Sequence, residues 1–454
     1  MRYRLFYFLL PLFLSATSLS QVSLQDKIGQ MIMVGFSGTT VSDSLKKDLQ
    51  SRNLGGVVLF ASNVTSPAQL KTLTNQLKSF SSTPLMIGID QEGGKVARLG
   101  SSNGYQPTNS AYKLGTLLGR EDSTRYTASL MAGWLYSGGV NLNLAPVLDV
   151  ITNPLNPVIA AKERSFSSDP AVVVNHARWF RDEFKKKGII TAYKHFPGHG
   201  SSQTDSHLGF TDVTNSWVES ELTPYRSLIN SGEVDIIMAG HIFNKNLDTS
   251  FPASISEKTI TGLLRDSLKF NGVVISDELF MKAIADNYTF DYAVELCIKS
   301  GTDILLFSTN MYNKRSLAGY LIENIYSKIQ SGVIKEELIH NAYNRIMKLK
   351  NNITTGVKYV QHIAASEPLL VSNYPNPFNS SSTIRFSLPK SDMVTIKVFD
   401  ALGREVTTLL SKTLQSGVYS IVFEADRYNL SSSVYYYQVA TSYDVKIGKM
   451  LLLK

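Results

Sequence analysis

The sequence has very little cysteine. Cys297 is the only one among 454 residues, which excludes an intramolecular disulfide and any cysteine-clustered metal site. Runs of five or six like charges are also missing, so the net charge of +8 does not indicate binding to nucleic acid. Hydrophobic residues make up 43% of the chain and charged residues 18%, a balance that is typical of packed globular domains and not of disordered or fibrous chains.

Long apolar runs are absent too. The apolar stretch from Leu5 to Leu14 has ten residues, whereas a membrane-spanning helix needs about 20. Arg2 and Arg4 precede this stretch and small residues follow it up to Ser20, which is the layout of a secretory signal peptide. We therefore predict that residues 1–20 are removed and that the mature chain is exported with no transmembrane segment. An uncleaved membrane anchor is the alternative.

From about residue 24 to 350, short apolar runs alternate with longer amphipathic segments such as 67–80 and 172–188. The runs are residues 30–36, 55–60, 85–90, 140–150, 188–196, 234–241, 272–278 and 302–308. Each is aliphatic throughout, which predicts strands buried on both faces of a parallel sheet. Eight strands alternating with helices predict a (β/α)₈ TIM-type barrel, and a doubly wound open sheet is the alternative.

The hydrophobic pattern changes to a period of two near the C-terminus, in segments 382–389, 393–400, 417–425 and 433–440. This alternation predicts a small antiparallel all-β domain, an immunoglobulin-like sandwich. We expect a signal peptide at 1–20, the barrel at 21–355, a linker at 356–371 and the β-domain at 372–454.

Ionisable residues follow five of the eight predicted barrel strands. They are Asp90, Asp149, Lys194 with His195, His241, and Asp277 with Glu278. In TIM-type barrels the functional groups come from the carboxyl ends of the strands, so this placement predicts an active site there. For any one of these residues, a helix cap or a solvated loop position is the alternative.

The segment KHFPGHGSSQTDSH (194–207) brings three histidines and Asp205 within fourteen residues. One hypothesis is a zinc site, although the glycines and Pro197 rule out a regular helical ligand pair. The other is that His207 is a general acid/base that Asp205 orients, because the neutral-range pKa of imidazole suits proton transfer. A mobile loop with incidental histidines is the third reading.

Five segments together resemble glycoside hydrolase family 3. They are DQEGGKVARL (90–99), NLNLAPVLDV (141–150), ERSFSSDP (163–170), KHFPGHG…DSH (194–207) and FNGVVISDELFM (270–281). The nearest branch is the single-domain β-N-acetylhexosaminidases. Two positions differ from the family pattern, Lys95 where arginine is usual and Glu278 where a second aspartate is common.

This resemblance implies hydrolysis with retention through a covalent glycosyl-enzyme, without metal or cofactor. Asp277 would be the nucleophile, and His207 the acid/base with Asp205 as its partner. The positions that would bind the terminal sugar are Asp90, Arg98, Arg164, Lys194 and His195. A carboxylate nucleophile suits a sugar that departs through an oxocarbenium-like state.

The C-terminal segment has a resemblance of its own. NYPNPFN (373–379), VFDALGREV (398–406) and the final KMLLLK are similar to the C-terminal sorting domain of type IX secretion substrates. That similarity implies the type IX secretion machinery as a partner and a secreted or cell-surface location reached via the periplasm. A spacer or a sugar-binding module is the alternative, and all three tryptophans lie before residue 350.

The expected function is that of an exported retaining β-N-acetylhexosaminidase with a carbohydrate substrate, releasing terminal N-acetylglucosamine from amino-sugar glycans. Three alternatives stay open at this point. A β-glucosidase of the two-domain type would need a further α/β domain, for which the chain has no residues to spare. A glycoside phosphorylase fits because a histidine acid leaves room for phosphate. A non-catalytic surface glycan-binding protein would be expected to lack Asp277 or His207, and both are present.

Overall fold

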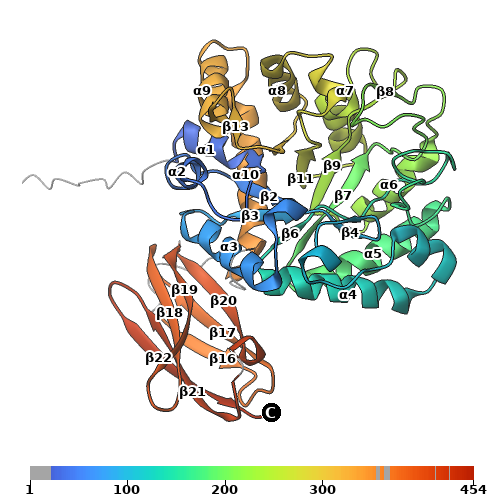
Figure 1. Ribbon diagram of the computed structural model, residues 1–454. Coiled ribbons are helices and arrows are strands. Elements are labelled where there is room, and N and C mark those ends of the chain that lie inside the picture. Colours follow the sequence, from blue (N-terminus) through green and yellow to red (C-terminus); the bar gives the residue numbers. More distant parts are fainter. Residues whose placement is uncertain (1–21, 354–357, 362–368, 415, 429) are drawn as a thin grey trace, which may run out of the picture.

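The structure is a computed structural model, and it describes residues 22–353, 358–361, 369–414, 416–428 and 430–454. The expected signal peptide and most of the expected linker lie outside these residues. Figure 1 shows a barrel of strands ringed by helices and, beside it, a separate all-β unit formed by the C-terminal part of the chain. Both fold classes predicted from the sequence are confirmed.

Eight parallel strands form the barrel, in the order β11-β9-β7-β6-β3-β2-β1-β12. Their bounds are β1 Ile32–Val34, β2 Gly56–Leu59, β3 Met86–Ile89, β6 Leu142–Asn143, β7 Ile190–Phe196, β9 Ile236–Ala239, β11 Val273–Ser276 and β12 Leu305–Phe307. Each falls within one of the eight predicted runs. A parallel bridge between Ile275 and Ile304 joins the two ends of the sheet, which closes the barrel and rules out the open doubly wound sheet.

Helices and short elements surround these strands. The α-helices are α1 Leu24–Gln30, α2 Asp43–Ser51, α3 Pro67–Ser79, α4 Glu121–Gly138, α5 Pro170–Lys186, α6 Thr223–Asn230, α7 Lys282–Ala285, α8 Phe290–Lys299, α9 Leu317–Gln330 and α10 Glu336–Ile353. Wider π-type helices are η3 Lys113–Leu118 and η6 Lys258–Ser267, and 3₁₀ turns are η1 Ala61–Asn63, η2 Ser101–Asn103, η4 Glu219–Leu222, η5 Ala253–Ile255 and η7 Ala425–Tyr428. Short strand pairs are β4 Gln91–Gly93 with β5 Val96–Ala97, β8 Thr211–Asp212 with β10 Ile242–Phe243, and β13 Met311–Tyr312 with β14 Arg315–Ser316.

Local sequence explains where the helices of the predicted segments 67–80 and 172–188 begin. The Ser66 side chain accepts the backbone N–H of Gln69, and Pro67 occupies the first turn of α3, where its missing N–H costs nothing. Asp169 and Pro170 start α5 in the same way. No helix in the described part of the chain is both long and apolar enough to cross a membrane.

The C-terminal unit consists of two four-stranded antiparallel sheets, ordered β15-β20-β17-β16 and β19-β18-β21-β22. The strands are β15 Lys358–Gln361, β16 Val371–Tyr374, β17 Ser381–Leu388, β18 Asp392–Phe399, β19 Glu405–Leu414, β20 Gly417–Glu424, β21 Ser433–Ala440 and β22 Val445–Leu452. Alternate residues such as Ile384, Phe386, Ile396 and Val398 fill one core between the sheets. β15 pairs with β20, although it lies in the range expected for the linker.

Candidate active site

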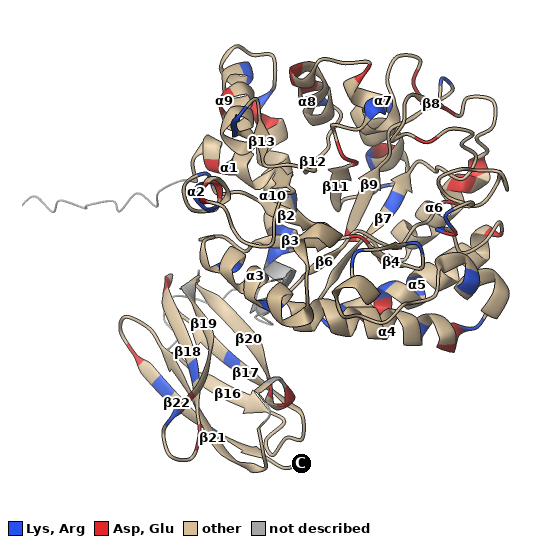
Figure 2. Cartoon of the chain, viewed as in Figure 1, with Lys and Arg blue, Asp and Glu red and all other residues tan. Residues whose placement is uncertain are grey.

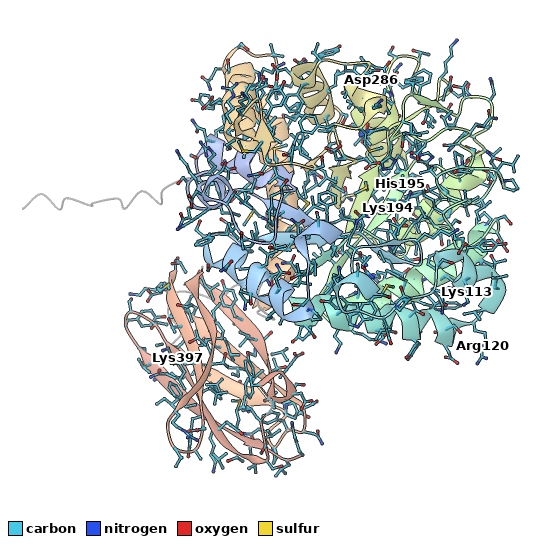
Figure 3. All side chains as sticks on the ribbon, viewed as in Figure 1. Lys113, Arg120, Lys194, His195, Asp286 and Lys397 are labelled. Carbon is cyan, nitrogen blue, oxygen red and sulfur yellow. The ribbon has the colours of Figure 1, made fainter. Side chains whose placement is uncertain are left out.

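Charged residues gather inside the ring of strands. Figure 2 shows acidic and basic positions close together around the ends of β4 and β7, and Figure 3 labels Lys194 and His195 of β7 near the centre of the barrel. Lys194 and His195 are both buried, together with Asp149 and Glu92. Ionised groups remain in such a place only when they are paired, so the contacts among them define the site.

One network joins Asp90, at the end of β3, to Glu92 of β4. Lys194 Nζ lies 2.7 Å from Asp90 Oδ1 and 2.7 Å from Glu92 Oε1. Arg164 donates to both oxygens of Glu92, from Nε at 2.9 Å and from Nη2 at 2.8 Å. Arg98 Nη2 donates to Asp90 Oδ2 at 3.0 Å.

These ion pairs decide the charge state of the two carboxylates. Burial alone would raise the pKa of each, but the neighbouring cations outweigh it, Lys194 and Arg98 at Asp90, and Arg164 and Lys194 at Glu92. The pKa of both carboxyl groups is therefore well below the usual range. The network joins two carboxylates to three basic side chains, and both carboxylates stay ionised at neutral pH.

A second set of contacts fixes the imidazole of His195. Asp149 Oδ2 lies 2.7 Å from His195 Nδ1, and Asp149 Oδ1 accepts the backbone N–H groups of His195 and His199 at 3.1 and 2.8 Å. Arg164 Nη2 lies 3.2 Å from His195 Nε2. Because a guanidinium only donates, Nε2 must accept and Nδ1 carries the proton toward Asp149. The contacts thus hold the His195 ring between Asp149 and Arg164.

Asp277 lies directly after β11, on the same rim of the barrel. Its backbone N–H donates to the carbonyl of Ala239 at 3.0 Å, and its Oδ1 accepts the N–H of Glu278 at 2.8 Å. Burial would raise the pKa of this carboxyl group, but the facing His241, His195 and His207 side chains lower it. Asp277 is therefore an ionised carboxylate at neutral pH.

His241 and Glu278 support the end of this strand. His241 Nε2 donates to the carbonyl oxygen of Glu278 at 2.9 Å, and its Nδ1 lies 2.6 Å from Ser254 Oγ. Burial lowers the pKa of His241, and the nearby Asp277 carboxylate opposes this effect. The Glu278 carboxylate accepts the backbone N–H of Ser308 at 2.9 Å, so it ties the end of β11 to the segment after β12.

The histidine segment 194–207 separates its three histidines. His195 and His199 are buried, whereas the His207 side chain is 57% exposed. His207 Nδ1 lies 2.8 Å from Asp205 Oδ1, which leaves Nε2 free to face a ligand. Asp205 is also held by Lys162 Nζ at 3.3 Å, and its pKa is lowered because the contacts with His207 outweigh partial burial.

The buried His199 ring contacts two serine side chains of the same segment. Its Nδ1 lies 2.6 Å from Ser202 Oγ and its Nε2 lies 3.3 Å from Ser206 Oγ, while burial lowers its pKa to about 4. Within the described residues, no group of three or more histidine, cysteine, aspartate or glutamate side chains is placed to hold a metal ion.

Sequence reasoning missed two carboxylates in this region. Glu92 belongs to the DQEGGKVARL segment, and only the fold brings Arg164 and Lys194 to it. Glu221 of η4 accepts the N–H of Gly200 at 2.9 Å and holds the histidine segment from behind; burial raises its pKa to about 7. No local spacing could have signalled either contact, since the partners are 21 to 102 residues apart in the chain.

Of the sequence-predicted residues, Asp90, Arg98, Arg164, Lys194 and His195 form one connected network. Asp277 follows β11, which is separated from β7 by β9, and Asp205 and His207 form a separate pair on the loop after β7. His195 and His207 both contribute to the lowered pKa of Asp277. The arrangement combines fixed donors and acceptors with one ionised carboxylate and one accessible imidazole.

Comparisons with known proteins agree with this arrangement. Residues 23–349 match the model of the glycosyl hydrolase family 3 N-terminal domain, and residues 372–453 match that of the secretion system C-terminal sorting domain. The chain is 32% identical over 338 residues to beta-hexosaminidase A of Pseudoalteromonas piscicida, covering 69% of this chain and 56% of that protein. It is 34% identical over 288 residues to a beta-hexosaminidase of Tolumonas auensis, covering 62% and 83%.

The fold has solved relatives as well. A family 3 beta-N-acetylglucosaminidase from Paenibacillus superposes with a TM-score of 0.69 at 29% identity, covering 79% of this chain and 72% of that one. The chain thus spans about half the length of the Pseudoalteromonas relative and most of the length of the other two.

Proposed function

We propose, from the membership of the chain in glycosyl hydrolase family 3, which makes it a glycoside hydrolase, a more specific function. The chain is an exported β-N-acetylhexosaminidase that releases terminal N-acetylglucosamine from amino-sugar glycans. The observation that carries this proposal is the placement of the Asp205–His207 pair on the same barrel rim as the ionised Asp277. Relatives named beta-hexosaminidase and a beta-N-acetylglucosaminidase support the sugar assignment.

In the proposed reaction, Asp277 attacks the anomeric carbon of the terminal sugar. Its lowered pKa keeps it ionised at neutral pH, as a nucleophile requires. The protonated His207 gives its Nε2 proton to the departing glycosidic oxygen, while Asp205 holds Nδ1 and stabilises the imidazolium. The products of this first step are a covalent glycosyl-Asp277 ester, a neutral His207 and the released aglycone alcohol.

The second step returns the enzyme to its starting state. Neutral His207 takes a proton from water, and the resulting hydroxide equivalent attacks the anomeric carbon. The bond to Asp277 breaks and its electron pair returns to the carboxylate. Two displacements on one carbon give net retention of configuration.

Sugar binding is assigned to the exposed side of the ionic network. The side chains of Asp90 and Arg98 are 16% and 32% exposed, whereas those of Glu92, Arg164 and Lys194 are at most 8% exposed. Arg98 Nε is buried and has no hydrogen-bond partner among the described residues. Asp90 accepts from sugar hydroxyls through its remaining lone pairs, and Glu92 keeps Arg164 and Lys194 in place.

The test compares an aryl N-acetyl-β-glucosaminide with the matching β-glucoside. A site that hydrogen-bonds a polar substituent loses strongly when the substituent is absent, by about 10²-fold or more in kcat/KM for a partly wet pocket. The β-anomer must be released first. Comparable rates on both substrates would remove the amino-sugar assignment in favour of a β-glucosidase, and a sugar phosphate formed in phosphate buffer would favour the phosphorylase. A fluorinated sugar should label Asp277 and not Glu278.

Export is assigned to the C-terminal unit, which matches a secretion sorting domain. We propose that the type IX machinery is its partner and that the route passes through the periplasm. Deleting residues 371–454 in the native host should strand the enzyme in the periplasm. Surface delivery of the truncated chain would contradict this assignment.

A further inference from the structure

A cavity of about 420 Å³ lies on the outer wall of the barrel, away from the ionic network. It is bounded by the start of α3, the last turns of α4 and the segment after η2. Its lining includes Pro67, Gly104, Tyr105, Gln106, Trp134 and Ser137. None of the residues assigned to the active site contributes to it. Its volume is in the range of small-molecule sites, roughly 300–1,000 Å³.

Two aromatic rings form the apolar part of the cavity. The rings of Tyr105 and Trp134 are 5.2 Å apart between centroids and tilted by 55°, so they present two differently oriented surfaces. Tyr105 is only 7% exposed. Within the described residues, no hydrogen bond involves the Tyr105 hydroxyl or the Trp134 indole N–H, and neither atom is among the buried unpaired ones. Both polar atoms therefore remain open to solvent or to a ligand.

The polar part of the cavity is uncharged. Gln106 and Ser137 are exposed and offer an amide and a hydroxyl group, and the lining contains no aspartate, glutamate, lysine or arginine. A charged ligand would lose its hydration without gaining a counter-charge here, which is costly. The lining therefore selects neutral ligands with one apolar face and several hydroxyl groups.

The wall that carries Tyr105 is preformed. The buried Asn103 side chain accepts the N–H of Gly100 at 2.8 Å and donates to the carbonyl of Arg98 at 2.8 Å. The N–H of Tyr105 donates to the carbonyl of Gly100 at 3.0 Å. These bonds hold the ring in place before any ligand arrives, which reduces the entropy cost of binding.

We propose that this cavity, the α3–α4 pocket, is a second carbohydrate-binding site that takes one or two rings of an uncharged pyranose oligomer. The C–H face of a pyranose packs on Trp134, and its hydroxyls pair with Tyr105, Gln106 and Ser137. The site would hold a glycan on the enzyme without cleaving it. This inference rests on the lining alone and goes beyond the proposed function, because it requires no turnover.

The experiment is a binding titration of chitotriose and cellotriose on the full chain carrying Asp277→Asn, which prevents hydrolysis. Trp134→Ala in that background should abolish one binding equivalent, or weaken it at least 10-fold, for both trisaccharides. Tyr126→Ala is the matched control, since Tyr126 is a 70% exposed aromatic residue on the same helix, outside the pocket. Gln106→Ala, at an exposed position, should weaken the same equivalent without affecting the fold.

Equal trisaccharide binding by the Trp134→Ala and Tyr126→Ala variants would overturn the proposal. If Trp134→Ala does not fold, unchanged trisaccharide binding by Gln106→Ala would overturn it instead. Trigalacturonic acid should bind the pocket at least 10-fold more weakly than cellotriose, and equal binding would refute the selection for neutral sugars. Hydrolysis of the aryl N-acetyl-β-glucosaminide by otherwise wild-type Trp134→Ala should stay within about twofold. Trisaccharide binding thus tests the α3–α4 pocket, and hydrolysis of the aryl substrate separately tests the proposed function.

Discussion

Glu92→Gln is the substitution that tests the ionic network most directly. The Glu92 side chain is 3% exposed and receives two hydrogen bonds from Arg164 and one from Lys194. Glutamine has nearly the same shape but no charge, and its NH₂ group would point a donor at one of these cations. Lys194 would still have Asp90, whereas Arg164 would have, besides the glutamine oxygen, only His195 Nε2 and the distant carbonyl of Val158.

The expected loss of stability follows from these contacts. Removing one partner of a buried ion pair costs about 3–5 kcal/mol, because the other charge stays buried without compensation. The remaining Asp90–Lys194 pair softens this, so we expect a decrease of about 3 kcal/mol in the free energy of unfolding. Arg164 also positions His195, and we therefore expect kcat/KM to fall by about 10²-fold, equal to about 2.7 kcal/mol.

Urea unfolding at pH 7 and initial rates on an aryl N-acetyl-β-glucosaminide measure the two effects. Glu121→Gln is the control, because Glu121 is half exposed and its pair with Arg125 on α4 should contribute only about 0.3–0.5 kcal/mol. Glu92→Gln and Glu121→Gln variants that unfold at the same urea concentration would refute the claim that the network carries buried charge. A stable Glu92→Gln enzyme with unchanged kcat/KM would show that Glu92 does not position the site.

Three further outcomes are expected. His207→Ala should reduce hydrolysis of substrates with poor leaving groups about 10²–10⁴-fold and that of activated aryl glycosides far less, and equal losses across leaving groups would show that His207 only shapes the loop. Burial lowers the pKa of Lys350 from its usual 10.5 to about 7, and between these values the unfolded chain binds the proton more tightly than the folded chain, so the free energy of unfolding rises with pH. The unfolding free energy of the wild type minus that of Lys350→Met should therefore rise by about 2–3 kcal/mol from pH 7 to pH 9. A difference that stays constant over this range would contradict the prediction. A chain of residues 21–360 should hydrolyse the aryl substrate with a kcat within about twofold of the full chain, and a large loss would mean that the C-terminal unit completes the active site.

Local sequence was enough to predict both folded units. Buried parallel strands are aliphatic on both faces, whereas sandwich strands alternate apolar and polar residues. Each pattern can be recognised within four to eight neighbouring residues. All eight predicted barrel runs contain a strand for this reason. The rule that barrel strands end in functional groups also placed Asp90, Lys194, His195 and Asp277 on one rim.

Only the tertiary structure decided how those residues pair. Arg164 comes from a long irregular segment after β6 and meets Glu92 across 72 residues of sequence, so no periodicity could reveal the contact. The proton position on His195 depends on Arg164 and Asp149 approaching opposite sides of one ring. The α3–α4 pocket likewise needs Tyr105 and Trp134, which are 29 residues apart, to meet on the outer wall. Hydrophobic patterning is a short-range property of the chain, whereas charge pairing and pockets exist only after barrel closure has brought distant segments together.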